Sequence, residues 1–140
     1  MIIPDVNILV SAHRASHQHH KEAKNWLSEA LIGKERIGIW DVSLISAFRI
    51  ITNSRIFADP SPANTALHYL DQVRNAPASR RIESGPKFWG HFLDAVELKS
   101  VSGTDASDAM LVALAFEYDA TIATFDRDFS GYAGLRTFRP

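Results

Sequence analysis

The chain has 140 residues, which is enough for one folded domain with a sizeable core. Hydrophobic residues make up 46% of it and charged residues 22%, which excludes a disordered or low-complexity protein. The net charge of -1 excludes a polycation that binds nucleic acid by bulk charge alone, and the absence of cysteine excludes disulfides, thiolate metal sites and cysteine nucleophiles.

The first eleven residues predict a buried strand that ends in an acid. The start is apolar, Asp5 follows it, and apolar residues from Ile8 to Ala12 then recur at helical spacing. In open α/β sheets, ligands bind at the carboxyl ends of the strands. Asp5 is therefore the first candidate for a functional site.

The rest of the chain alternates between predicted helices and strands. Apolar spacing predicts helices over 23–31, 44–51, 66–73, 88–96 and 109–115, and short apolar runs predict strands at 37–40, 80–82, 120–124 and around 135–138. This alternation predicts an α/β fold with a central, mostly parallel sheet. Because no repeat or linker is visible, we expect a single domain over residues 1–140.

Targeting and membrane segments are not expected. Asp5 interrupts the apolar start and no basic leader precedes it, which argues against a signal peptide. The longest apolar run, 109–116, is far shorter than the roughly 18 residues of a spanning helix. With no cysteine to suggest an oxidising compartment, we expect a cytoplasmic protein with no membrane partner.

Several acids follow predicted strands or begin a predicted helix. Asp5 and Asp126 come directly after strands, and Asp128 lies two residues further on. Asp105 and Asp108 lie near the start of the helix that precedes the later strand. If the two strands are parallel neighbours, their acids emerge at one edge of the sheet. Clustered carboxylates repel one another, and a bound Mg²⁺ or Mn²⁺ relieves this repulsion because both ions prefer oxygen ligands.

Each of these acids also has a structural interpretation. An aspartate after a strand is often a helix cap or a turn former, and Asp105 fits either role. Asp41 is interpreted as a cap. Four histidines are expected at the surface or as caps, namely His13, His17, His19 and His20. Three tryptophans are expected to pack in the core, namely Trp26, Trp40 and Trp89.

Several motifs, taken in order, resemble those of the PIN-domain nucleases. Residues 3–10 (IPDVNILV) resemble the family's opening, 105–115 its helix-start acid, and 123–129 its strand-end motif. The stretch 48–57, with 17–23 and 134–136, resembles the VapC branch, the toxins of bacterial toxin–antitoxin pairs. The resemblance covers nearly the whole chain and implies a three-layer α/β/α domain.

The resemblance implies roles for particular residues. Asn7 would hold Asp5 or a metal-bound water through a hydrogen bond. Ser46 stands where the family commonly has a glutamate, and Asp105 is better placed than Asp41 to compensate. The catalytic acids and ligands of Mg²⁺ (or Mn²⁺) would be Asp5, Asp108 and Asp126, with Asp128 and Asp105 as supporting ligands.

The implied activity is that of a toxin-type endoribonuclease. It would hydrolyse RNA phosphodiester bonds, in tRNA or rRNA, and so inhibit translation and growth until a cognate VapB-like antitoxin neutralises it. A homodimer is also expected. Arginines pair with phosphate in a forked geometry, so Arg49 and Arg55 are the first candidates for binding the substrate, followed by Arg14 and Arg127.

Two other classes of protein stay open. Without the usual glutamate, the chain would be a catalytically weak module that binds RNA or an antitoxin, and metal binding without cleavage would favour this. A phosphotransfer enzyme with Asp5 as its nucleophile is the second. Haloacid dehalogenases have another aspartate two residues on, where this chain has Asn7, and receiver domains have an early acid pair that is absent.

Overall fold

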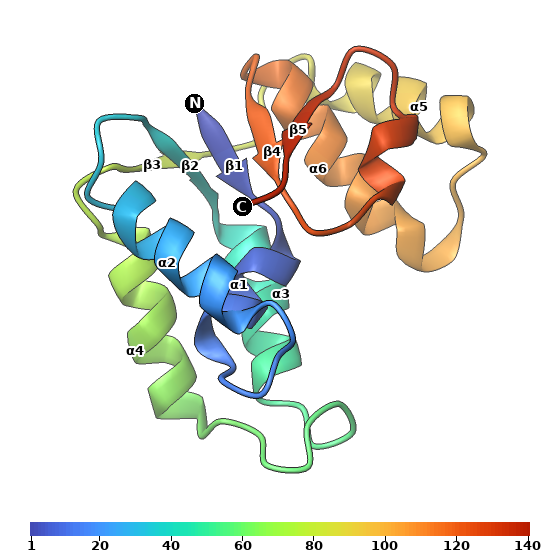
Figure 1. Ribbon diagram of the computed structural model, residues 1–140. Helices are drawn as coiled ribbons and strands as arrows, with labels where there is room; N and C mark the ends of the chain where they lie inside the picture. The colour runs from blue at the N-terminus through green and yellow to red at the C-terminus, as the bar shows by residue number, and fades with distance from the viewer.

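The computed structural model describes residues 1–140 and contains one five-stranded parallel sheet with the order β3-β2-β1-β4-β5 (Figure 1). The strands are β1 (Ile2–Pro4), β2 (Ile37–Trp40), β3 (Ser79–Ile82), β4 (Thr121–Ala123) and β5 (Arg136–Phe138). The chain first adds β2 and β3 on one side of β1 and then adds β4 and β5 on the other side. The carboxyl ends of β1 and β4 consequently lie side by side at the point where an open parallel sheet binds its ligands.

Six α-helices connect the strands, and each overlaps a helix that the apolar spacing predicts. They are α1 (Val6–His13), α2 (His20–Ala30), α3 (Asp41–Ile51), α4 (Ala63–Arg74), α5 (Phe88–Lys99) and α6 (Ala106–Glu117). Short 3-10 helices cover Gly103–Asp105 (η1) and Asp128–Gly131 (η2). None of these helices has the length and apolarity needed to cross a membrane.

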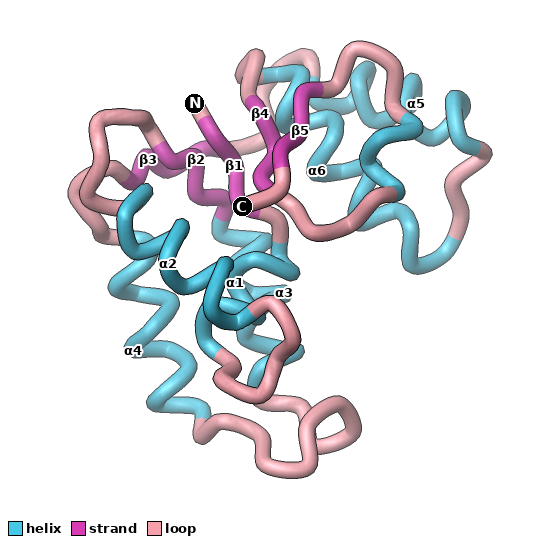
Figure 2. The backbone as a smooth tube through the Cα atoms, viewed as in Figure 1, coloured by secondary structure: helices cyan, strands magenta, loops and turns pink.

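The sheet separates two hydrophobic cores, because successive strand residues point to opposite faces. In β2, Ile39 packs with α1–α4 on one face, whereas the adjacent Trp40 packs with α5 and α6 on the other. Figure 2 shows the strands between these two groups of helices. The prediction of a three-layer α/β/α fold with a parallel sheet is confirmed.

Two structural interpretations from the sequence are wrong. The side chain of Trp89 is 64% exposed on α5, although its place in an apolar stripe predicts core packing. Asp41 begins α3 but makes no cap hydrogen bond. Its carboxylate instead accepts from Arg74 of α4, with 2.8 Å between Arg74 Nε and Asp41 Oδ1, and this hydrogen bond lowers the pKa of Asp41.

Candidate active site

Asp5 lies between β1 and α1, at the carboxyl edge of the sheet. Its side chain is only 7% exposed. The amide of Asn7 donates to Asp5 Oδ2 at 2.5 Å, and the hydroxyl of Thr124 donates to the same oxygen at 2.6 Å. The position of this carboxylate is therefore fixed by two donors, one from each of two neighbouring strand ends.

The same polar network joins the segment after β1 to the segment after β4. Asn7 Nδ2 also donates to Thr124 Oγ1 at 3.1 Å, and its Oδ1 accepts from the backbone of Phe125 at 3.3 Å. The backbone N–H of Asp126 donates to Thr124 Oγ1 at 3.0 Å. Sequence reasoning missed Thr124. The available signal was a hydroxyl residue between a predicted strand and a candidate acid.

The acids predicted from the sequence share one electrostatic environment. Burial raises the pKa of Asp5, and the charge of Asp126 adds to this effect. Burial also raises the pKa of Asp108 to about 6, with further contributions from the charges of Asp5, Asp126, Asp105 and Asp128. Carboxylates raise one another's pKa only when they lie close together. This agrees with the fold, in which Asp5 and Asp126 follow the adjacent strands β1 and β4, and Asp108 lines the same cavity as Asp5.

The acids face two cavities. Asp5 and Asp108 line one of about 170 Å³, together with Ser46 and Arg49. Ser46, which the resemblance places where the family commonly has a glutamate, thus lines the same cavity as two of the acids. Asp126 instead lines a cavity of about 420 Å³.

The other candidate residues differ in their contacts. Asp105 lies in η1, directly before α6, and its side chain is exposed. Asp128 begins η2, and its backbone N–H donates to Asp126 Oδ1 at 2.8 Å. Arg55 lines neither cavity that contains the acids. Arg14 binds the 55–62 connector, where it donates to Ser61 and to the carbonyl of Asp59.

The chemistry of this donor set fits a hard divalent cation. All the ligand candidates are carboxylates. Burial and then repulsion from the neighbouring carboxylates raise the pKa of Asp108, and a bound cation would relieve the repulsion. No three acidic or histidine side chains are close enough to surround an ion in the conformation seen. Metal binding would therefore require the carboxylates to rotate towards one another or water to complete the shell.

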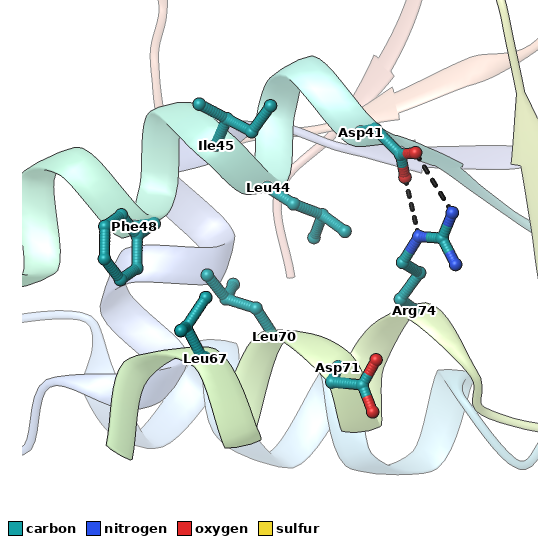
Figure 3. A pocket seen from close by; sticks show the side chains of 8 residues that line it. All are labelled: Asp41, Leu44, Ile45, Phe48, Leu67, Leu70, Asp71 and Arg74. Carbon is teal, nitrogen blue, oxygen red and sulfur yellow. Dashed lines mark hydrogen bonds and ion pairs between the residues drawn. The ribbon is translucent and has the colours of Figure 1, made fainter. Parts of the chain in front are cut away.

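A separate apolar groove of about 320 Å³ runs between α3 and α4 (Figure 3). Ile45 and Leu67 face it and are 67% and 56% exposed. The ion pair between Asp41 and Arg74 lies at one end of the groove. None of the five acids gathered at the sheet edge lines it.

Comparison with known proteins defines the class of this one. The PIN domain model matches residues 2–135, and the chain belongs to the PIN domain family. Among its relatives is Ribonuclease VapC43 of Mycobacterium tuberculosis, which is 34% identical over 140 residues, or 100% of this chain and 95% of the relative. The resemblance that the motifs indicated, including the VapC branch, is confirmed.

Solved structures share the fold along the whole chain. Mycobacterium tuberculosis VapC20, described as a sarcin-ricin loop cleaving toxin, aligns with a TM-score of 0.72 and 17% identity over 100% of both chains. VapBC2 from Rickettsia felis, bound to a DNA fragment from its promoter, aligns with a TM-score of 0.70 and 17% identity over 99% of this chain and 98% of the other. At this level of identity the likeness concerns the fold.

Proposed function

We propose that this protein is a toxin-type endoribonuclease that hydrolyses RNA phosphodiester bonds with a divalent metal ion. The observation that carries the proposal is the placement of Asp5 and Asp126 after the adjacent parallel strands β1 and β4, with Asp108 lining the same cavity as Asp5. This arrangement occurs in a PIN-domain chain whose relatives of similar length are named ribonucleases. Carboxylates arranged around a hard cation suit hydrolysis of phosphodiesters.

The metal ion proposed is Mg²⁺, with Mn²⁺ as a substitute. Asp5, Asp108 and Asp126 would hold it. Asp128 and Asp105 would support them, since the charges of both act on Asp108. When bound, such an ion polarises the phosphate and makes a bound water more acidic. Asn7 and Thr124 fix the carboxylate of Asp5 for this role.

Substrate binding next to the acids is assigned to Arg49. It faces the cavity that Asp5 and Asp108 line, and a guanidinium binds a phosphate through two parallel hydrogen bonds. Arg55 has less support, because it lies outside both cavities that the acids line. The RNA class proposed is tRNA or rRNA in the cytoplasm.

Cleavage of RNA by aspartate variants tests this function. Asp5→Asn and Asp126→Asn keep the size of each side chain but remove the charge that binds a cation. We expect each to reduce Mg²⁺-dependent cleavage by more than about 100-fold. Asp94→Asn, exposed on α5, is the control and should cut at the wild-type rate. The assignment is wrong if both active-site variants cut as fast as the wild type.

The alternative is a catalytically weak module that binds RNA or an antitoxin. The observation in its favour is Ser46, which supplies no carboxylate to the cavity that it lines with Asp5 and Asp108. It is less well supported, because relatives of matching length carry ribonuclease names. Wild-type protein that binds Mg²⁺ and RNA but leaves the RNA intact would establish it.

We further propose a VapB-like antitoxin as the partner that neutralises the protein. The groove between α3 and α4 suits an amphipathic helix, since apolar walls accept its apolar face and the charges of Asp41, Asp71 and Arg74 meet its polar edge. A basic side chain beyond that helix would then pair with the acids. A homodimer of the toxin is proposed beside this complex.

A further inference from the structure

Three side chains from distant parts of the chain form a stack at the rim of the candidate active site. His19 precedes α2, Phe125 follows β4 and Arg139 follows β5. The rings of His19 and Phe125 are stacked, with 4.4 Å between their centroids and 23° between their planes. The guanidinium carbon of Arg139 lies 5.1 Å from the centre of the Phe125 ring, and Arg139 Nη2 lies 3.4 Å from His19 Nε2.

This stack borders the cavity that Asp126 lines. Phe125 and Arg139 form part of the wall of this cavity of about 420 Å³. Thr124, which donates to Asp5, lines it as well. A ligand in this cavity therefore lies beside Asp126 and next to the residue that holds Asp5.

The stack is anchored to the same network that holds Asp5. The backbone N–H of Phe125 donates to Asn7 Oδ1 at 3.3 Å, and its carbonyl accepts from Arg139 Nη1 at 3.2 Å. His17 and His20, by contrast, contact Ser11 of α1. His17 Nδ1 lies 3.0 Å from the hydroxyl of Ser11, and His20 Nδ1 lies 2.9 Å from its carbonyl.

Two guanidiniums at this cavity have no acidic partner. Arg127 and Arg139 both line it, and neither forms an ion pair with a carboxylate, whereas Arg136 at the opposite end of β5 pairs with Asp119. An arginine without a carboxylate partner is available to a phosphate. The cavity thus combines free positive charge with an aromatic surface.

Proteins commonly recognise unpaired RNA with aromatic surfaces and basic side chains placed side by side. Bases that are free of a helix stack on aromatic side chains and on arginine, while basic side chains hold the backbone phosphates. We propose that His19, Phe125 and Arg139 form a subsite that binds one unpaired nucleotide of the RNA strand, next to the phosphodiester that is cut. This inference rests on the proposed ribonuclease function and adds residues outside the acidic cluster and outside Arg49.

Variants of Arg139 test the phosphate contact. The probe is a fluorescein-labelled single-stranded RNA oligonucleotide, titrated with the full chain in EDTA so that binding is measured without cleavage. We expect Arg139→Gln to weaken binding about tenfold and to reduce the salt slope by about one. Arg36→Gln removes the same charge from an exposed position at the other end of the sheet and should bind like the wild type.

Fluorescence of a 2-aminopurine base tests the stacking. We expect wild-type protein to quench a single 2-aminopurine in the oligonucleotide, and His19→Ala and Phe125→Leu to lose at least half of the quenching. Arg139→Lys keeps the charge but loses the flat guanidinium, so it should recover the salt slope but not the affinity. Melting curves identify any variant that fails to fold, and Arg139→Lys then serves as the deciding variant.

The outcomes separate this subsite from the ribonuclease function. If the wild type cleaves RNA and the His19, Phe125 and Arg139 variants bind and quench like it, the subsite is refuted and the function stands. If the wild type does not cleave but Arg139→Gln loses binding, the function is refuted and the subsite stands. If the wild type neither binds nor cleaves, both are refuted.

Discussion

At the residue scale, Thr124 supports the site without being an acid. Its hydroxyl donates to Asp5 Oδ2 and accepts from the backbone of Asp126, so it holds both strand ends together. We expect Thr124→Val to reduce kcat/KM for RNA by about 10–100-fold, because Asp5 loses a donor that orients it. Thr124→Ser keeps the hydroxyl and should restore most of the activity. Full activity in Thr124→Val would show that the hydrogen bond does not matter.

Asp108 is placed where its charge is unfavourable in the metal-free protein. Its folded pKa of about 6 exceeds the ordinary 3.8, so the folded state binds more protons than the unfolded state between these pH values. Stability therefore falls as the pH rises through this window. We expect Asp108→Asn to raise the free energy of unfolding by about 1 kcal/mol at pH 7.5, after allowance for solvent screening of a half-buried group.

Urea unfolding in EDTA at two pH values checks this effect. The gain from Asp108→Asn should disappear near pH 3, where the aspartate is protonated in the folded state and largely so in the unfolded state. Excess Mg²⁺ should reverse the order of stability at pH 7.5, because only the wild type keeps the ligand. A gain of equal size at both pH values would refute the electrostatic explanation.

At the scale of the element, two glycines should respond to alanine in opposite directions. Gly90 lies inside α5, and a Cβ there would meet nothing within 4 Å. Gly103 in η1 has a positive φ of 59°, which is unfavourable for a residue with a Cβ. We expect Gly90→Ala to raise the free energy of unfolding by about 0.5–1 kcal/mol and Gly103→Ala to lower it by a similar amount. Chemical denaturation measures both, and the same sign in both would contradict this account.

The elements themselves were predictable because their signals are local. The apolar run Ile37–Trp40 is strand β2, and spacings of three and four residues locate all six helices. The contacts across the fold were not predictable. Thr124 meets Asp5 only because β1 pairs with β4, across 119 residues of chain. The prediction that Trp89 packs in the core was wrong for a related reason, since an apolar stripe does not reveal which of its residues lack a covering element.

At the scale of the whole molecule, the α3–α4 groove is the proposed docking site of the antitoxin helix, and it is separate from the acids proposed to cleave RNA. Leu67 lies in the groove and Leu98 on α5, across the sheet, and both are 56% exposed. We expect Leu67→Glu to cleave RNA normally but to resist neutralisation by the antitoxin, with binding weakened at least tenfold. Leu98→Glu should behave like the wild type in both assays. Neutralisation titrations and light scattering provide the measurements.

Two results would contradict this assignment of the groove. Unchanged neutralisation of Leu67→Glu would show that the antitoxin binds elsewhere. A change from dimer to monomer in light scattering, with neutralisation intact, would show that a second copy of the chain covers the groove instead.

The position of β1 in the middle of the sheet determines which segments must be present before the candidate site is complete. Asp5 precedes its donor Thr124 by 119 residues of chain, and Thr124 and Asp126 follow β4, which pairs with β1. A chain that does not yet include β4 and Thr124 therefore lacks one of the two donors to Asp5. We therefore expect a chain that ends before β4 to lack ribonuclease activity.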